Sequence, residues 1–293
     1  DIYTFRMSFP FSFEEAWVPL GHSAFSIERL LEMKPYLKPP ERVCEIDYTT
    51  GEMYDIPDGC LSIWHEPEAG KEYDIGADPA AGVEDGDPAA AVVIERGTNR
   101  QMAEWRGIIP AADFGSILYF LGRYYNWAQV APEIETYGLA TSIRLQELNY
   151  PNIHLWIKAR DTLSPKYSNQ VGWATTRYTK LILVVLAQDL IWNRKVRIYS
   201  EVLWNELMSF IRDVTPSGLH TYNAAGDSHD DLTMSWLIAL RISRDETAYR
   251  MEGELVSKQE KIGEKYGLDP AHYDAEGLRP AGMRSANEEM RAW

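Results

Sequence analysis

The chain has 293 residues, of which 45% are hydrophobic, and a formal net charge of −15 at pH 7. Its apolar content and its ten Trp residues are enough for a substantial core, which excludes a chain that is disordered throughout. The acidic balance by itself argues against a nucleic-acid partner, and no run approaches the roughly 18 apolar residues of a membrane span.

Residues 1–70 carry scattered prolines and little periodicity, which predicts an extended connector with a few short elements. Ser12 and Glu15 have the spacing of a capping box and predict a helix start. Short strands are expected near residues 42–48 and 60–65. Because the chain begins with Asp1 rather than Met, we expect it to be a piece of a longer protein.

Residues 72–96 read EYDIGADPAAGVEDGDPAAAVVIER and predict a β-hairpin. The first strand covers residues 73–77 and delivers Asp78, and the second covers residues 89–95 after a turn rich in Gly and Asp. A carboxylate beside a buried sheet is costly unless it has a partner, and small residues around Asp78 leave room for one. Asp78 is therefore a candidate metal ligand, and the alternative is a side chain that only caps the turn.

The remaining sequence alternates between helical and extended patterns. Strands are expected over residues 101–108, 128–134, 153–157 and 196–199, and helices over residues 110–125, 139–148, 176–192, 201–212, 232–241 and 246–266. Residues 162–173 lack periodicity and predict a loop or a hairpin. Three antiparallel strands, a helix, a parallel fourth strand and alternating elements after it describe a ribonuclease H-like α/β fold with a mixed sheet flanked by helices.

Acidic residues occupy particular places in this order of elements. In such a topology the first and fourth strands are neighbours at the sheet centre, so Asp78 and Glu133 are expected side by side. The helix over residues 232–241 opens with Asp230 and Asp231, whose carboxylates would lean over the same strand ends. Acids at a helix start are also favoured by the helix dipole, so the alternative is a pair that merely caps the helix.

These motifs resemble the C-terminal nuclease domain of the large terminase subunit of tailed phages and related viruses. The resemblance covers residues 5–241 and rests on GADPA at 76–80 with GDPAAAVV at 86–93, APE at 131–133 with Gly138, VGWATT at 171–176 with Lys180, and HDDL at 229–232. It implies a connector from a missing ATPase domain over residues 1–70, a ribonuclease H-like nuclease domain over 71–245 and a helical tail over 246–293. No phosphate-binding loop of the form GxxxxGK[ST] occurs in the sequence, so we expect no ATPase motor in this chain.

One departure from the family pattern concerns the second acid. The family commonly carries an Asn-rich stretch before the glycine, whereas residues 134–137 read IETY. Glu135 therefore competes with Glu133. Glu133 is favoured because it follows Ala-Pro and precedes Gly138 by five residues.

The resemblance implies a metal-dependent endonuclease that cuts double-stranded viral DNA during genome packaging. Two Mg²⁺ or Mn²⁺ ions would be bridged by Asp78, with Glu133 and Asp231 as outer ligands and Asp230 as a further ligand or the helix cap. It also implies double-stranded DNA, the portal protein and the small terminase subunit as partners, no membrane, and the cytoplasm of the host cell as location. The alternatives are another ribonuclease H-like nuclease, of the resolvase or transposase type, and a non-enzymatic module that docks on a portal protein.

A basic strip covers residues 158–197, which contain eight basic and two acidic residues. The rest of the chain therefore carries a net charge of −21. Such a strip can bind a polyanion locally, although a solvated helix face gives the same count. Lys166, Arg177 and Lys180 lie beside a helix start whose amides can hold a phosphate, and they are the candidate contacts to the DNA backbone.

Overall fold

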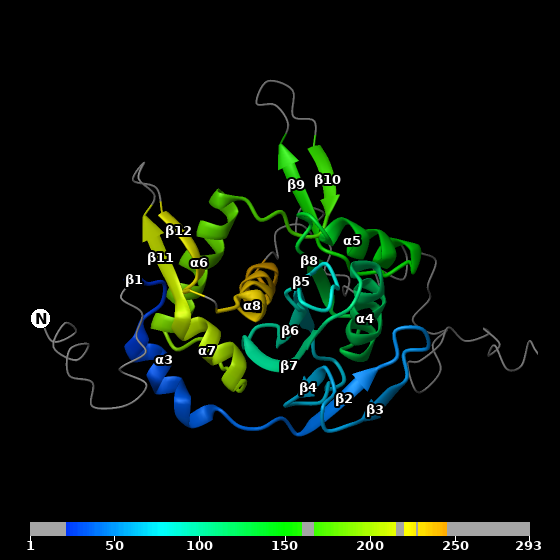
Figure 1. Cartoon of the computed structure of the whole chain (residues 1–293), viewed down its shortest axis with the longest axis horizontal. Helices are drawn as coiled ribbons and strands as arrows, with labels where there is room; N and C mark the ends of the chain where they lie inside the picture. Colours follow the sequence, from blue (N-terminus) through cyan, green and yellow to red (C-terminus); the bar gives the residue numbers. More distant parts are fainter. Residues whose placement is uncertain (1–21, 160–166, 215–219, 227, 245–293) are drawn as a thin grey trace, which may run out of the picture. The chain divides into compact units, whose positions relative to one another are not determined.

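The computed structural model describes residues 22–159, 167–214, 220–226 and 228–244, all of which belong to the first of two compact units, Asp1–Asp245 (Figure 1). The helices expected at Ser12 and over residues 246–266 lie outside the described residues, as does Lys166. Within these described ranges, no helix is long and apolar enough to cross a membrane.

A seven-stranded mixed sheet forms the centre of the molecule, in the order β3-β2-β4-β7-β6-β5-β8. The strands are β2 (Arg42–Ile46), β3 (Met53–Asp55), β4 (Leu61–Ile63), β5 (Tyr73–Asp78), β6 (Ala89–Glu95), β7 (Arg100–Gly107) and β8 (Gln129–Pro132). β6 pairs antiparallel with both β5 and β7, and β8 pairs with β5 in parallel. This is the mixed α/β sheet that the sequence predicts.

The sheet differs from the prediction in its extent. β2, β3 and β4 come from the expected connector and continue the sheet beyond β7. β5 and β8 are neighbours, but the expectation that they lie at the sheet centre is wrong, because β8 is the last strand of the order. The division of the chain at residue 70 stays a prediction, although strands from both sides of it share one sheet.

The two later strands expected over residues 153–157 and 196–199 do not become strands of the central sheet. β9 (Leu155–Ala159) pairs with β10 (Tyr167–Val171) in a separate antiparallel hairpin. Residues 196–199 form no strand and make only a single bridge to the sheet, between Arg197 and Arg100. The base of the β9–β10 hairpin closes the outer edge of β8 through bridges from Ile153 to Val130 and from Trp173 to Glu133.

A small three-stranded sheet replaces part of a predicted helix. α7 (Glu201–Ser209) ends three residues earlier than expected, and β11 (Phe210–Val214) follows it directly. β11 pairs with β12 (His220–Ala224) and with β1 (His22–Ser23). Phe210 continues the helical spacing of buried Leu203 and Leu207, so the helical pattern extends past the residue where the backbone turns into a strand.

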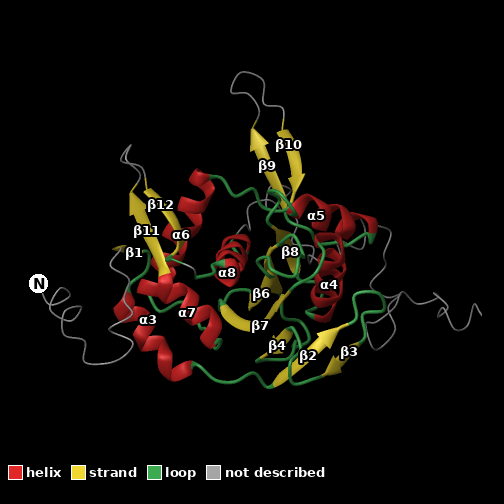
Figure 2. Ribbon diagram, viewed as in Figure 1, coloured by secondary structure: helices red, strands yellow, loops and turns green. Residues whose placement is uncertain are grey.

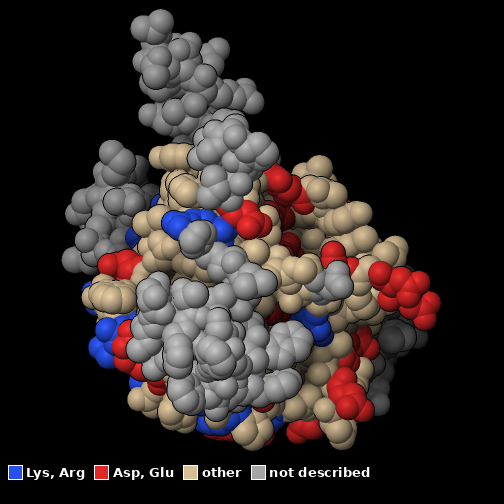
Figure 3. Space-filling model, turned by 60° about the vertical axis from the view of Figure 1, so that its left-hand side comes forward, with Lys and Arg blue, Asp and Glu red and all other residues tan. Residues whose placement is uncertain are grey.

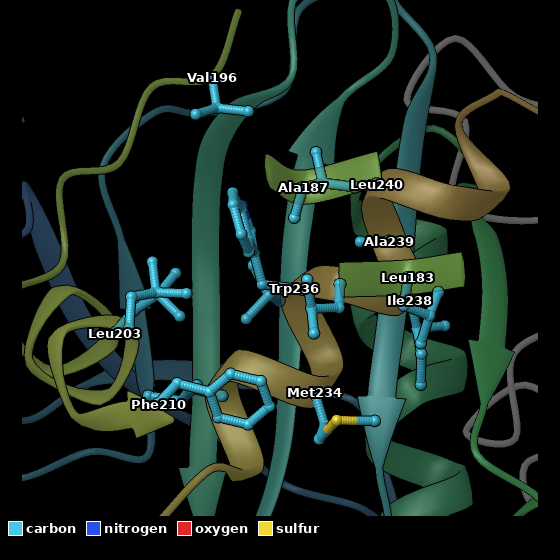
Figure 4. Close-up of a cluster of buried hydrophobic side chains, with 14 of the residues drawn as sticks. Leu183, Ala187, Val196, Leu203, Phe210, Met234, Trp236, Ile238, Ala239 and Leu240 are labelled. Atoms are coloured by element: carbon cyan, nitrogen blue, oxygen red, sulfur yellow. The ribbon is translucent and has the colours of Figure 1, made fainter. Parts of the chain in front are cut away.

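Helices cover both faces of the central sheet (Figure 2). α4 (Ala111–Tyr124) and α5 (Gly138–Glu147) enclose one core with Ile75, Ala91 and Val93 of the strands. The opposite face packs against α6 (Arg177–Trp192), α7 and α8 (Asp231–Ile242), with α3 (Ile27–Met33) and the short 3-10 helix η1 (Lys34–Tyr36) beyond them. Side chains of α6, α7 and α8 meet around buried Trp236 (Figure 4).

α8 lies directly against β5, and Gly76 is the reason it can. A Cβ on Gly76 would collide with the backbone oxygen of Ser235 and lie 2.5 Å from the backbone nitrogen of Ala239. The Ser235 hydroxyl also donates a hydrogen bond to the carbonyl of Ala90, at 3.0 Å. This close packing brings the first turn of α8 to the strand ends where Asp78 lies.

Candidate active site

The parallel pairing of β5 and β8 brings two carboxyl groups together. Asp78 is the last residue of β5, and Glu133 follows directly after β8. The backbone nitrogen of Glu133 donates to the carbonyl of Ala77 at 2.8 Å, so both acids leave the sheet at the same level. Their carboxyl groups hydrogen-bond to each other.

The turn after β8 explains why Glu133 is the acid that faces Asp78. β8 ends at Pro132, and Glu135 lies in an exposed bend beyond it. A Cβ on Gly138 would collide with the carbonyl oxygen of Glu133, so the compact turn back into α5 requires glycine there. Glu135 is near enough that its charge helps raise the pKa of Glu133.

Burial governs the protonation of this pair. It raises the pKa of Asp78 well above its usual range, and the negative charges of Glu133 and Asp231 raise it further. Burial also raises the pKa of Glu133, but the neighbouring Thr175 hydroxyl and the positive charge of Lys180 oppose the shift. Two touching carboxyl groups in this environment favour either a shared proton or a cation between them.

The first turn of α8 supplies two further acids. Asp230 occupies the N-cap position, yet its side chain makes no capping hydrogen bond, so the pair does not merely cap the helix. The Asp230 carboxylate instead lies 3.5 Å from the ammonium of Lys180. Burial raises the pKa of Asp231 to about 6. One oxygen of Asp231 (Oδ2) is buried and accepts no hydrogen bond from the described residues.

Glu206 of α7 caps α8 in place of Asp230. Its Oε2 accepts a hydrogen bond from the backbone nitrogen of Thr233 at 2.8 Å, and Thr233 is the third residue of α8. That amide is one of those a side-chain cap normally satisfies. The capping carboxyl group therefore comes from a neighbouring helix, and the Asp230 and Asp231 carboxylates are left for other partners.

Two basic side chains border Asp231: His229, from the HDDL motif, and Arg106, which the sequence motifs do not indicate. Nδ1 of His229 is 3.8 Å from Asp231 Oδ2 and 3.3 Å from Oδ1 of Asp87, in the turn between β5 and β6. A guanidinium nitrogen of Arg106 is 4.0 Å from the same Asp231 oxygen. Arg106 shares its register position with Ala90, which in turn pairs with Asp78, so the three residues form one row across the sheet.

Solved structures share this arrangement of strands and helices. The structure matches the large terminase nuclease from the thermophilic phage G20c with bound magnesium, with a TM-score of 0.57, 21% sequence identity, and coverage of 76% of this chain and 98% of that chain. The same nuclease with bound cobalt gives a TM-score of 0.55 at 20% identity, again covering 76% and 98% of the two chains. The large terminase nuclease domain of Thermus phage P74-26 gives 0.50 at 18% identity, covering 72% and 93%.

The fold is that of a large terminase nuclease. At these identities the match concerns the ribonuclease H-like fold. No protein-family model matches the chain, and no curated protein matches it.

The residues predicted from the basic strip to contact DNA have unequal surroundings. Arg177 is exposed at the first position of α6 and donates to the carbonyl of His220 at 3.3 Å. Lys180 points into the acidic site, where its ammonium approaches Asp230 and donates to Oδ1 of Asn223 at 3.4 Å. The start of α6 is closed by a reciprocal capping pair, Thr176 and Thr179. The Thr179 amide, one of the helix-start amides predicted to be able to hold a phosphate, donates instead to the Thr176 hydroxyl.

The donors suit a hard cation, but the described residues do not form a complete metal cluster. In the part of the chain that the structure describes, no three His, Cys, Asp or Glu side chains are grouped so that they could hold a metal ion. What is present is the touching Asp78–Glu133 pair and the buried Asp231 oxygen without a hydrogen bond. All three offer carboxylate oxygens, which Mg²⁺ and Mn²⁺ prefer.

One face of the molecule combines both signs of charge. Figure 3 shows acidic side chains in a hollow of this face, with basic side chains beside it. Such a surface binds a polyanion only where a cation offsets the acids.

Proposed function

We propose that the chain is a metal-dependent endonuclease that cuts double-stranded DNA, as the nuclease part of a large terminase. The observation that carries the proposal is the contact between Asp78 and Glu133 at adjacent parallel strand ends, beneath the start of α8, in a terminase nuclease fold. A role in viral genome packaging, with the portal protein and small terminase subunit as partners in the host cytoplasm, is part of this proposal.

In this proposal Asp78, Glu133 and Asp231 hold divalent cations, Mg²⁺ or Mn²⁺. Two such ions would lower the pKa of a water molecule and stabilise the charge that develops on the attacking and leaving oxygens of a phosphodiester. Asp230, whose carboxylate lies 3.5 Å from the Lys180 ammonium, would be a further ligand.

The protein's own groups prepare these acids for a cation. Thr175 and Lys180 favour the ionised form of Glu133, which burial alone would keep protonated. His229, between Asp87 and Asp231, is placed to carry a proton away from the reacting water. Arg106 offsets part of the negative charge that would otherwise repel a phosphate.

The first test is cleavage of supercoiled plasmid with Mn²⁺ or Mg²⁺, with EDTA as the blank. We expect Asp78→Asn to reduce cleavage to the EDTA level while circular dichroism shows an intact fold, because an amide lacks the negative charge with which Asp78 would hold a divalent cation. Asp85→Asn is the matched control, since Asp85 is exposed in the turn after β5. A folded Asp78→Asn protein that cuts at the wild-type rate would refute the proposal, as would a folded wild type that binds no Mn²⁺. A wild type that binds Mn²⁺ and a portal protein but cuts no DNA would instead support the docking alternative.

A further inference from the structure

The start of α8 depends on a single side chain of another helix. An α-helix leaves its first backbone N–H groups without partners, and a polar residue at the N-cap normally accepts from the second or third of them. Asp230 stands at that position and makes no such bond. The Thr233 amide is satisfied by Glu206 at 2.8 Å.

Glu206 lies on the buried face of α7 between Leu203 and Leu207, a place where helices normally carry apolar residues. It is 7% exposed, and its second oxygen (Oε1) is buried without a hydrogen-bond partner among the described residues. A buried carboxyl group at such a position lowers the stability of the fold unless a hydrogen bond compensates for the loss of its contact with water. The bond it makes is to the turn that carries Asp231.

We infer that Glu206 is a positioning residue for the metal site, which holds the first turn of α8 so that Asp230 and Asp231 face the Asp78–Glu133 pair. If Asp230 capped the helix itself, its carboxylate would turn back onto the Thr233 amide and away from the site. The Glu206 bond removes that competition. The inference rests on the proposed function, because the positioned carboxylates are its metal ligands.

Three substitutions separate positioning from bulk stability. Glu206→Gln keeps an oxygen that can accept from the Thr233 amide, whereas Glu206→Leu removes it. Glu206→Asp keeps the carboxyl group on a shorter side chain that no longer reaches the Thr233 amide. This variant replaces Glu206→Leu in the test if the leucine variant does not fold. Glu95→Leu is the matched control, because Glu95 is 3% exposed, accepts from Thr98 at 2.7 Å, and pairs with the start of β5 rather than its end.

The main readout is Mn²⁺ affinity measured by calorimetry on folded protein without DNA. We expect Glu206→Leu and Glu206→Asp to bind Mn²⁺ about tenfold or more weakly, as is usual when a group that orients a metal ligand is removed. Glu206→Gln should stay within about threefold of the wild type, within the range of a retained hydrogen bond. Glu95→Leu should lower the unfolding temperature and leave Mn²⁺ affinity unchanged.

A second readout follows the helix start directly. Hydrogen exchange in a peptide covering residues 228–240 should be faster in Glu206→Leu than in Glu206→Gln. Wild-type Mn²⁺ affinity in the leucine and aspartate variants would overturn the inference, as would equal losses in Glu206→Gln and Glu206→Leu. If the wild type and Asp78→Asn bind Mn²⁺ equally, the proposed function fails instead, so the two failures are distinguishable.

Discussion

Gly76 determines how closely the acid-bearing helix approaches the acid-bearing strand. The backbone of α8 occupies the space where any Cβ at this position would lie, and backbone cannot rotate away as a side chain can. The same glycine stands two residues before Asp78, on the same face of β5. One missing methyl group therefore fixes the separation between the two halves of the proposed site.

We expect Gly76→Ala to push α8 away from β5. Overpacking of this kind costs about 1–3 kcal/mol of unfolding free energy, which urea denaturation would measure. Cleavage should fall further than this loss of stability explains, because Asp231 moves away from Asp78. Gly86→Ala is the control, since its new methyl would meet only exposed Val83. Equal behaviour of the two variants would contradict this account of α8 packing.

The acids that the sequence motifs indicate are those on strand ends and the helix start, because local patterns mark such positions. Asp78 follows an apolar strand, and Asp230 and Asp231 precede an apolar helix. The motifs do not indicate Glu206, although a signal exists, namely a charged residue on the apolar face of α7. Its partner, Thr233, is 27 residues away, and no local pattern links the two.

Neighbouring basic residues on one helix can have different partners, as α6 shows. Arg177 and Lys180 are three residues apart, and the sequence pattern predicts one DNA clamp from both. Arg177 is exposed, whereas the Lys180 side chain is 20% exposed and its ammonium faces Asp230. The two cations therefore serve different groups.

Arg177→Gln and Lys180→Gln should separate these roles. Arg177→Gln should weaken DNA binding and flatten its salt dependence by up to about 0.9 log units per log unit of salt for each phosphate that the protein no longer neutralises, without changing Mn²⁺ affinity. Lys180→Gln removes the charge that lowers the pKa of Glu133, so protons compete better with the metal. The ratio of Mn²⁺ affinities at pH 8 and pH 6 should therefore exceed that of the wild type. If both variants flatten the salt dependence equally and leave this affinity ratio unchanged, Arg177 and Lys180 both contact the DNA backbone and the separation of roles is wrong.

The ends of helices and strands can be predicted where a local sequence pattern determines them. They cannot be predicted in this way where pairing with a distant strand determines them. The hairpin of β5 and β6 and the helix α4 lie close to their expected ranges. The predicted helix runs on to residue 212, inside β11, because Phe210 continues the apolar spacing of α7. β11 is a strand because it pairs with β12, and the periodicity of a single segment does not reveal such a pairing.

For the molecule as a whole, the buried carboxyl groups make stability depend on pH. Burial raises the pKa of Glu104 to about 7 and that of Glu206 to about 8, from an ordinary value of 4.5. Glu104 accepts hydrogen bonds from Gln101 at 3.0 Å and Ser200 at 2.9 Å, and thereby ties the start of α7 to the sheet. Between pH 4.5 and 7 the unfolded chain has released this proton while the folded one keeps it. The folded state then binds more protons, so the unfolding free energy falls as pH rises through this window and levels off above it.

Glu104→Gln should remove its share of this dependence. Between pH 5 and pH 8 the wild type should lose about 2 kcal/mol more unfolding free energy than the variant, as measured by urea denaturation. Glu206 and Asp231 keep a residual slope in both proteins, so the difference between them is the quantity to test. Identical slopes in the two proteins would show that Glu104 is ionised throughout.

The closed outer edge of β8 joins the β9–β10 hairpin mechanically to the proposed site. The amide of Trp173 donates to the Pro132 carbonyl at 2.8 Å, and the amide of Ile134 donates to the Trp173 carbonyl at 2.9 Å. These two bonds flank Glu133 on either side. A displacement of the hairpin base must therefore break these two bonds or move the backbone of Glu133, whose own amide is bonded to Ala77 of β5. The distance between the two carboxyl groups therefore depends on a hairpin outside the central sheet as well as on the pairing of β5 with β8.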